Sequence, residues 1–248
     1  MTPLSFPAGT GLLRRLLKGL LDRSGRWPGR CAICHAWPAH SLCETCVSRF
    51  ASPVVRCSLC ALHMPSGQVC CVACLRQPPA HRRCIAAVDY GWPWSDLIAS
   101  FKFQGQTGWA RPFATLMLAA EGMQELLDEV DLVTGVPLSR ERLAARGYNQ
   151  SLLLARALCP DKSHDALLLR LRDTPAQHSL SRRERLLNLQ GSLAAEPAHA
   201  RLLLGRHVLL VDDVMTSGAT LQSATDTLLQ AGAAQVSTAV FARTPAPA

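Results

Sequence analysis

The chain has few aromatic residues and no long apolar segment. Aromatic side chains make up 5% of the 248 residues, although hydrophobic residues of all kinds make up 48%. Leucine and alanine must therefore fill most of the core, and the length is sufficient for about two domains. No apolar run approaches the ~18–20 residues that cross a bilayer, so the sequence predicts no transmembrane segment.

The N-terminal stretch lacks the uninterrupted apolar run of a secretory leader. Leucines recur at helical spacing between Leu12 and Leu21, but Arg14, Arg15 and Lys18 stand among them. An export signal would not carry these cations, so we expect no signal peptide and a cytoplasmic protein. A basic amphipathic helix can lie on a membrane, but a face of this kind more often packs on its own protein.

Acidic residues are outnumbered by basic ones. The chain has 18 aspartates and glutamates against 26 lysines and arginines, which gives a formal net charge of +8. This balance favours polyanionic partners such as nucleic acid, anionic lipid or phosphorylated small molecules. A solvated basic surface without such a partner is the alternative.

Cysteine is abundant in one part of the chain and nearly missing from the rest. Ten of the eleven cysteines lie between Cys31 and Cys84, and Cys159 is the exception. Two C-x-x-C turns supply the four thiolates of a structural zinc site, whereas disulfides would require a secreted protein. The sequence therefore predicts two zinc sites. Their ligands come from four such turns: Cys31, Cys34, Cys43, Cys46, Cys57, Cys60, Cys71 and Cys74.

The pairing of these turns stays open at this point. Sequential pairing has short, similar loops and is preferred over an interleaved arrangement. Cys70 could replace Cys71, and His35 and His63 are expected to be bystanders. A segment of this size is too small for a large core and needs its metal to fold. We expect an N-terminal helix and linker over residues 1–28, a double zinc ribbon over 29–84, and a larger domain over 85–248.

The larger domain alternates between strand and helix patterns. Such alternation predicts an α/β fold, a mainly parallel sheet with helices on both faces. Ligands of such sheets bind beyond the carboxyl ends of the strands. Strands are expected within 84–91, 131–138, 166–172, 206–214 and 234–243, and helices within 95–103, 109–130, 141–159 and 218–232.

The stretch VLLVDDVMTSGAT, Val208 to Thr220, combines a buried strand with polar residues. Asp212 and Asp213 fall at the carboxyl end of the strand, and the loop after them opens a helix. Backbone N–H groups at a helix N-terminus bind phosphate, and carboxylates accept hydrogen bonds from sugar hydroxyls. The stretch therefore predicts a ribose-phosphate site. A Walker A loop is excluded because no lysine follows the glycine.

The same stretch resembles the PRPP-binding motif of type I phosphoribosyltransferases. The resemblance extends to VPLSRERLAARGYNQ (Val136 to Gln150) and to RDTPAQHSLSRRERLLNLQGSL (Arg172 to Leu193). Together with the four C-x-x-C turns, these segments make nearly the whole chain similar to the ComF family of competence-associated, GntX-like proteins. The resemblance implies a type I phosphoribosyltransferase fold preceded by a zinc ribbon.

The resemblance also implies roles for particular residues. Asp212 and Asp213 would bind the ribose 2′ and 3′ hydroxyls, and magnesium would accompany PRPP. The 5′-phosphate would be held by Thr216, Ser217, Gly218, Ala219 and Thr220. A pyrophosphate loop and a hood over the site would comprise Gly135, Val136, Pro137, Arg146, Gln177, Arg182, Arg185 and Asn188. No general base and no acceptor are identified.

Two functions follow as hypotheses. The first is a ComF-type protein of DNA uptake and natural transformation that binds PRPP and single-stranded DNA, with DNA-uptake or recombination proteins as partners. The alternative is a PRPP-dependent transferase acting on a small molecule, with no nucleic-acid role. For the first, we expect a basic rim and aromatic residues that stack on bases. The candidates are Arg140, Arg142, Arg146, Arg182, Arg183, Arg185, Trp92 and Trp94.

Overall fold

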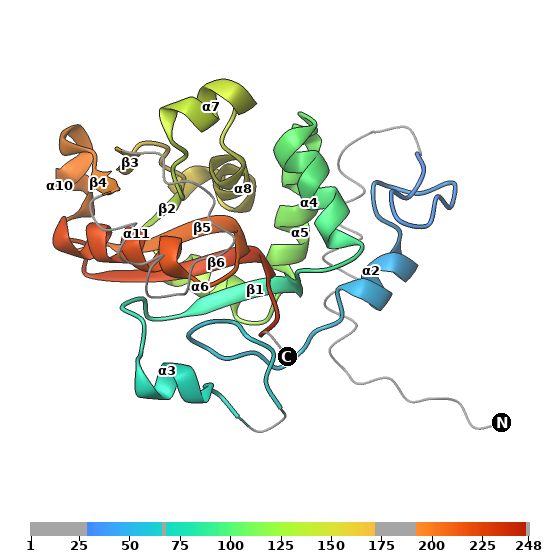
Figure 1. Cartoon of the computed structure of the whole chain (residues 1–248), viewed down its shortest axis with the longest axis horizontal. Coiled ribbons are helices and arrows are strands. Elements are labelled where there is room, and N and C mark those ends of the chain that lie inside the picture. Colours follow the sequence, from blue (N-terminus) through green and yellow to red (C-terminus); the bar gives the residue numbers. More distant parts are fainter. Residues whose placement is uncertain (1–28, 66–67, 172–191, 247–248) are drawn as a thin grey trace. The chain divides into compact units, whose positions relative to one another are not determined.

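The computed structural model describes residues 29–65, 68–171 and 192–246 (Figure 1). The chain forms two compact units that meet in sequence between Ala51 and Ser52. The second half of the cysteine-rich segment thus belongs to the same unit as the larger domain, although its composition suggests a boundary near residue 84. The three expected functional domains stay a prediction.

The first unit is organised around one short helix and a turn. Helix α2 (Glu44–Phe50) begins after Cys43, whose side chain accepts a hydrogen bond from the backbone N–H of Cys46. Gly29 and Ala39 form an isolated antiparallel bridge that closes the loop before it. The local fold therefore brings two C-x-x-C turns to the same end of α2.

The second unit contains a four-stranded parallel sheet, as the alternating pattern predicts. Its strands are β1 (Cys84–Asp89), β2 (Leu132–Gly135), β5 (His207–Met215) and β6 (Gln235–Arg243), arranged in the order β1-β6-β5-β2. All three pairings are parallel, so the carboxyl ends of the strands share one edge of the sheet. At that edge Gly135 is opposite Val211, and Asp212 is opposite Val240.

The two central strands are buried on both faces. Val208, Leu209, Leu210 and Val211 of β5 are all 0% exposed, which agrees with the unbroken apolar run in the sequence. Neighbouring residues of β6 point to opposite faces, so Val240 and Phe241 pack against different helices.

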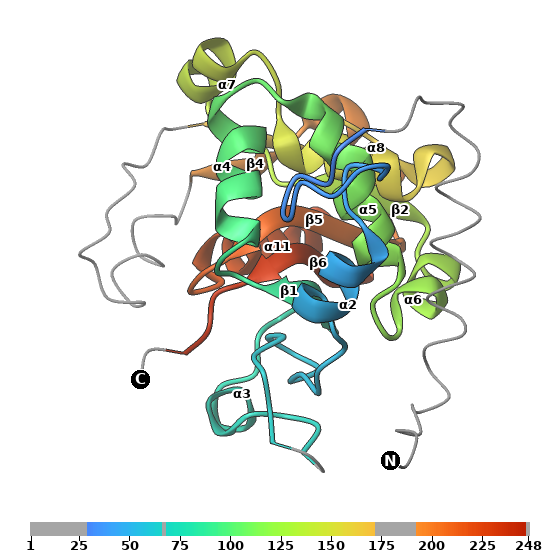
Figure 2. The same cartoon turned by 90° about the vertical axis from the view of Figure 1, so that its right-hand side faces the viewer.

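Helices cover both faces of the sheet (Figures 1 and 2). On the Phe241 face, α5 (Ala110–Leu118) stacks Phe113 on Phe241, with ring centroids 4.0 Å apart. Helices α4 (Trp94–Phe103) and α8 (Gln150–Leu158) lie on this face too. On the other face, Leu221, Ala224 and Leu228 of α11 (Ala219–Gln230) join a core with Val240.

Two helices expected to be continuous are each divided. The segment 109–130 forms α5 and α6 (Met123–Glu129), and the segment 141–159 forms α7 (Arg140–Arg146) and α8. Gly147 has φ 81° and ends α7, and the Asn149 side chain then accepts hydrogen bonds from the first N–H groups of α8. The expectation of unbroken helices was wrong because these breaks depend on caps inside an otherwise helical apolar pattern.

The remaining elements are short. The strand expected within 166–172 forms as β3 (Leu168–Arg170), but it pairs with β4 (Leu193–Ala195) in a separate antiparallel sheet. Across the part of the chain that the structure describes, no helix is long and apolar enough to cross a membrane. The other helical elements are α3 (Val72–Arg76), α10 (Ala200–Leu203), η2 (Thr107–Trp109), η3 (Pro160–Lys162) and η4 (Pro197–His199).

Candidate functional site

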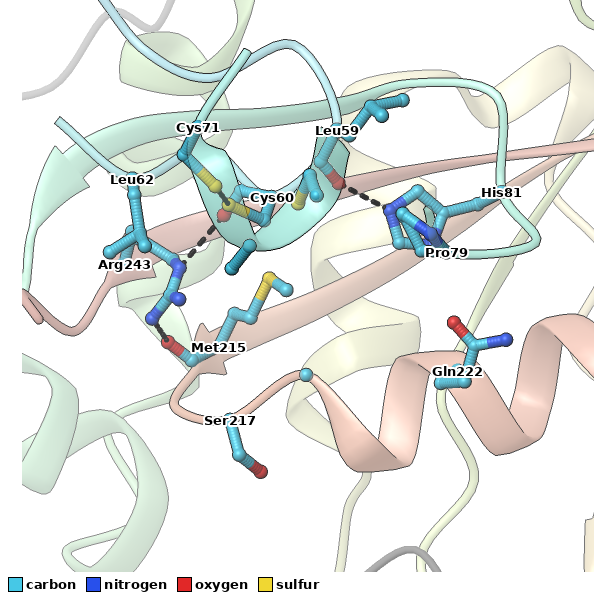
Figure 3. Close-up of a pocket in the computed structure, with 13 residues that line it drawn as sticks. Leu59, Cys60, Leu62, Cys71, Pro79, His81, Met215, Ser217, Gln222 and Arg243 are labelled. Atoms are coloured by element: carbon cyan, nitrogen blue, oxygen red, sulfur yellow. Dashed lines mark hydrogen bonds between the residues drawn. The ribbon is translucent and has the colours of Figure 1, made fainter. Parts of the chain in front are cut away.

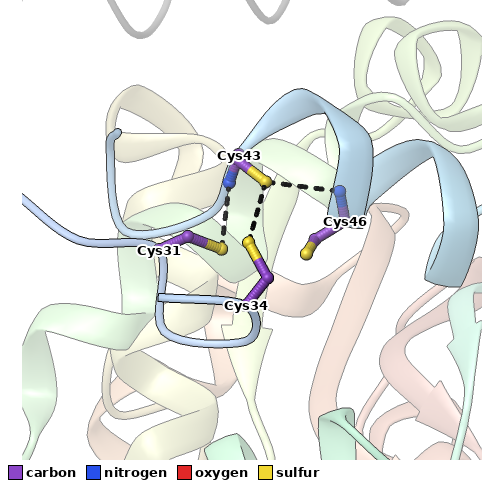
Figure 4. Close-up of side chains that lie close together, drawn as sticks. All are labelled: Cys31, Cys34, Cys43 and Cys46. Atoms are coloured by element: carbon purple, nitrogen blue, oxygen red, sulfur yellow. Dashed lines mark hydrogen bonds between the residues drawn. The ribbon is translucent and has the colours of Figure 1, made fainter. Parts of the chain in front are cut away.

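Four thiols of the first unit converge on one point (Figure 4). The sulfur atoms of Cys31, Cys34, Cys43 and Cys46 all lie within 4.8 Å of one another. The backbone N–H of Cys43 points to the Cys31 sulfur at 3.4 Å, and the Cys34 and Cys43 sulfurs are 3.6 Å apart. We call this group the first cysteine cluster.

A second cysteine cluster forms in the other unit. It comprises Cys57, Cys60, Cys71 and Cys74, again with all four sulfurs within 4.8 Å of one another. The backbone N–H of Cys71 points to the Cys57 sulfur at 3.3 Å. The four turns are thus grouped in sequential order. Cys70 lies beside the cluster, with its sulfur 3.9 Å from that of Cys57.

Both clusters have the donors and spacing that a zinc ion requires. A tetrahedron with Zn–S distances of about 2.3 Å has edges of about 3.8 Å, close to the observed 3.6 Å between Cys60 and Cys71. Burial raises the pKa of the Cys31 thiol, but backbone N–H groups at Cys34, Cys43 and Ile33 outweigh it and lower the pKa to about 6. The backbone around Cys31 therefore favours the thiolate of this residue, the form that binds metal.

The acidic pair at the end of β5 is held by two other elements. Asp213 is 2% exposed, and its Oδ1 lies 3.0 Å from the Nζ of Lys102 in the last turn of α4. Its Oδ2 is buried and has no hydrogen-bond partner among the described residues. A buried carboxylate oxygen without a partner is unfavourable, which marks this atom as a position for a ligand donor.

Asp212 faces the start of α8. Its Oδ1 accepts hydrogen bonds from the Ser151 hydroxyl at 2.7 Å and from the backbone N–H of Asp213 at 2.9 Å. Burial and the neighbouring Asp213 carboxylate raise the pKa of Asp212 to about 7, although the Ser151 hydrogen bond and Lys102 oppose the shift. Asp212 therefore holds a proton to a higher pH than an ordinary aspartate does.

The predicted pyrophosphate loop is packed tightly against α8. A side chain at Gly135 would place its Cβ 2.4 Å from the backbone of Ser151 and Leu152, so only glycine fits. The Asn149 amide donates to the Val136 carbonyl at 2.9 Å, and the Val136 N–H donates to Val211 at 2.9 Å. These contacts join the ends of β2 and β5 to the first turn of α8.

The predicted phosphate loop leads into α11. Thr216 is exposed, Ser217 is half-buried, and Gly218 precedes the helix with φ 78°. Ala219 and Thr220 form the first turn of α11, and the Ala219 N–H points to the Ser217 hydroxyl at 3.4 Å. The loop thus presents hydroxyl groups and a helix N-terminus at the same sheet edge as the acids.

Two further side chains at this edge were missed by sequence reasoning. Lys102 is one. A cation in the last turn of a helix is ordinarily explained by its interaction with the helix dipole, so its position in the sequence indicated no contact with Asp213. Phe103 is the other, 74% exposed, with the Arg146 guanidinium 5.2 Å from its ring centroid. The predicted hood residues lie outside the described residues: Gln177, Arg182, Arg185 and Asn188.

The fold and the site define a phosphoribosyltransferase-like protein. Residues 175–248 match the model of the phosphoribosyl transferase domain family, and this match includes β5, the acidic pair and the phosphate loop. The parallel sheet and the two cysteine clusters agree with the expected α/β fold preceded by a cysteine-rich region.

Comparison with known proteins narrows this class to one family. The chain is 32% identical over 232 residues to DNA utilization protein YhgH of Escherichia coli strain K12, covering 88% of this chain and 98% of that protein. It is 29% identical over 205 residues to Competence protein F of Haemophilus influenzae, covering 79% of this chain and 88% of that protein. It is 32% identical over 149 residues to Competence protein ComFC of Bacillus subtilis, covering 60% and 59%. The chain therefore belongs to the ComF family of DNA utilization and competence proteins.

Metal content tests the cysteine clusters. Purified protein is expected to hold two zinc ions per chain, and Cys43→Ser is expected to lose the ion of the first cluster while keeping that of the second. Because a structural zinc site contributes on the order of 10 kcal/mol of apparent binding energy to folding, the first unit should unfold in this variant. Elemental analysis and limited proteolysis measure both effects. A zinc content near zero in the wild type would rule out the assignment.

The pKa of Asp212 predicts a pH dependence of stability. Its value in the folded state, about 7, lies above the ordinary 3.8, so between these limits the folded protein holds a proton that the unfolded chain has lost. The free energy of unfolding should therefore fall as pH rises from about 4 to about 7. Urea unfolding across this range should show a smaller fall in Asp212→Asn, whereas Asp96→Asn, at an exposed position on α4, should match the wild type. Equal pH slopes in all three proteins would contradict the prediction.

Proposed function

We propose that the crevice beyond the carboxyl end of β5 binds PRPP. The observation that carries the proposal is the buried, unpartnered Oδ2 of Asp213 beside the N-terminal loop of α11. A ribose hydroxyl supplies the missing donor, and the 5′-phosphate of the same molecule reaches the loop. The Lys102 ammonium lies 3.0 Å from the other oxygen, Oδ1, so Oδ2 is the oxygen left to accept from a ligand.

The remaining groups of the crevice have complementary roles in this proposal. Asp212 accepts from the second ribose hydroxyl, with Ser151 orienting its carboxylate. The hydroxyls of Thr216, Ser217 and Thr220 and the N–H groups of the loop donate to the phosphate. When bound with PRPP, magnesium would supply positive charge that offsets the negative charge of the pyrophosphate.

The loop over residues 135–137 has few backbone N–H groups left to donate to a pyrophosphate. The Val136 N–H is already used by Val211, and Pro137 has no N–H. Its contribution is therefore to shape the crevice, since Gly135 lets α8 and Ser151 come close to Asp212. We assign the pyrophosphate charge to Lys102, a cation that already contacts Asp213.

Displacement at ribose C1, with pyrophosphate as the leaving group, is the chemistry that the family resemblance implies. Positioning and charge stabilisation would supply most of the catalysis. We propose binding of the ribose phosphate and assign no acceptor. Transfer to a small-molecule acceptor without a nucleic-acid role is the alternative function, and consumption of PRPP with and without single-stranded DNA distinguishes the two.

Removing the charge of Asp213 tests PRPP binding. Asp213→Asn should weaken the affinity for magnesium–PRPP, because charge-assisted hydrogen bonds contribute ~1.5–3 kcal/mol each. Isothermal titration calorimetry measures the dissociation constant in wild type, Asp213→Asn and the control Asp96→Asn. Equal affinity in wild type and Asp213→Asn would show that this carboxylate does not bind the ribose.

A second proposal is that the rim of the same crevice contacts single-stranded DNA. Phe103 follows Lys102 directly, so its exposed ring lies beside the residue that holds Asp213. The Arg146 guanidinium over this ring makes a mixed aromatic and cationic surface, the kind on which bases stack. The names of two relatives, which refer to DNA utilization and to competence, also support contact with DNA.

The aromatic residues predicted to stack on bases need correction. Trp94 is 2% exposed and packs edge-on against Phe241, with ring centroids 5.6 Å apart, so it belongs to the core and the prediction for it was wrong. Trp92 is 64% exposed and stays a prediction. Helix α7, which carries Arg140, Arg142 and Arg146, has no buried residue. The predicted arginines at 182, 183 and 185 lie outside the described residues.

Phe103→Ala tests the stacking surface. The variant should bind a single-stranded oligonucleotide more weakly, since a stacked base contributes ~1–3 kcal/mol, and Phe103→Trp should restore binding. Fluorescence anisotropy with an oligothymidine and with an abasic strand of equal length measures the effect, which should be confined to the strand with bases. The same loss on both strands would contradict stacking.

Salt dependence tests the basic rim. Affinity should fall steeply as salt rises, with a logarithmic slope of ~0.7 per phosphate contacted. Replacing Arg140 and Arg142 with alanine should lower the affinity and this slope, whereas Arg111→Ala, at an exposed position on α5, should leave both unchanged. An affinity independent of salt would remove the rim from the proposal and favour the small-molecule transferase.

A further inference from the structure

A buried arginine joins the second cysteine cluster to the phosphate loop (Figure 3). Arg243, the last residue of β6, is 7% exposed. Its Nε donates to the carbonyl of Cys60 at 2.8 Å. Its Nη1 donates to the carbonyls of Met215 at 3.0 Å and Thr216 at 2.6 Å, the residues that open the phosphate loop. One rigid guanidinium therefore holds a cluster residue and the loop at fixed positions.

Met215 connects the phosphate loop to the start of β1. The thiol of Cys84, the first residue of β1, lies 3.7 Å from the Met215 sulfur. A Cβ at Gly218 would lie 2.5 Å from the end of the Met215 side chain, so the loop rests directly on it. A shift of the backbone at Met215 would therefore displace Gly218 and the start of α11.

A cavity of about 60 Å³ lies between the cluster and the loop. Cys60, Cys74, Met215, Ser217, Gly218 and Arg243 are among the residues that line it. Its volume has room for a few water molecules and none for a sugar phosphate. We therefore treat this cavity as part of the contact between the cluster and the loop, and not as the ligand site.

The position of the Cys60 carbonyl depends on the metal. The segment from Cys57 to Cys74 has one regular element among its described residues, the five-residue helix α3. Such a segment is fixed by its ligands rather than by secondary structure. If the metal leaves, the Cys60 carbonyl loses the constraint that the ligand sulfur of the same residue imposes, and we expect it to shift. Arg243 then loses an acceptor, and a buried cation that loses a partner favours rearrangement of its other contacts.

We propose that Arg243 is a positioning residue that couples metal binding at the second cysteine cluster to ligand binding at the phosphate loop. The proposal rests on PRPP binding at that loop. Coupling between two sites is reciprocal: a metal that strengthens PRPP binding must itself be bound more tightly when PRPP is present. The first cluster belongs to the other compact unit and serves as the matched control.

Two double variants separate the clusters. Cys43→Ser with Cys46→Ser leaves zinc in the second cluster, and Cys71→Ser with Cys74→Ser leaves it in the first. Competition with a chromophoric chelator, in saturating magnesium with and without PRPP, measures the zinc affinity of each. PRPP should tighten zinc binding about 5-fold or more in the first variant, a typical size for coupled sites, and have no effect in the second.

Arg243→Lys tests the connection itself. Lysine keeps the charge, but one ammonium group cannot span the carbonyls of Cys60, Met215 and Thr216 as the guanidinium does. The variant should keep two zinc ions and bind PRPP about 5-fold more weakly, and the effect of PRPP on zinc affinity should disappear. Arg206→Lys, at a half-exposed arginine paired with Asp131, is the control and should behave as wild type.

The outcomes separate this inference from the proposed function. If PRPP binds the Cys43→Ser, Cys46→Ser protein without changing its zinc affinity, the coupling is wrong. If wild type does not bind PRPP, the proposed function fails, and hydrogen exchange decides the coupling instead. Removing zinc from the same variant should then speed exchange in Met215–Ala219 and in the cysteine segment. Unchanged exchange there, or an equal rise throughout the sheet, would overturn the inference.

Discussion

The carboxyl group of Asp213 lies at a position that water hardly reaches, and the neighbouring elements are arranged around that constraint. The carboxylate is 2% exposed, so it needs partners from the protein or from a ligand. Lys102 contacts one oxygen of Asp213, and the Ser151 hydroxyl donates a hydrogen bond to the adjacent Asp212. These partners come from α4 and α8, two helices of the same face, which must therefore end and begin at this edge of the sheet.

The parallel sheet makes that arrangement possible. Since all strands run in one direction, the loops after β2 and β5 open at the same edge, and so does Arg243 at the end of β6. Gly135 then allows the backbone of α8 to approach closely enough for Ser151 to reach Asp212. A ligand with both hydroxyl and phosphate groups matches this edge because it meets carboxylates on one side and a helix N-terminus on the other.

Local patterns were predicted well, and contacts between distant segments were not. The apolar run of β5 and the C-x-x-C spacing are each visible within a few residues of sequence. The buried strand and the cysteine groups could therefore be predicted. Lys102 and Arg243 carry no such local signal, because each acts through a partner far away in the chain. Trp94 was named as a candidate for base stacking because the stretch Trp92-Pro93-Trp94 reveals nothing about the Phe241 ring that buries it.

The two faces of the sheet are filled by different kinds of side chain, and the second cysteine cluster belongs to one of them. The buried rings gather on the α4 and α5 face, where Trp94, Phe101 and Phe113 pack with Phe241. The α11 face has aliphatic side chains instead, and the buried cysteines of the second cluster belong to the same core. A thiolate shell around a metal fixes backbone in a way that small aliphatic side chains do not. The second cysteine cluster thus packs on the same side of the sheet as α11, in one core with Val208, Leu210 and Val240.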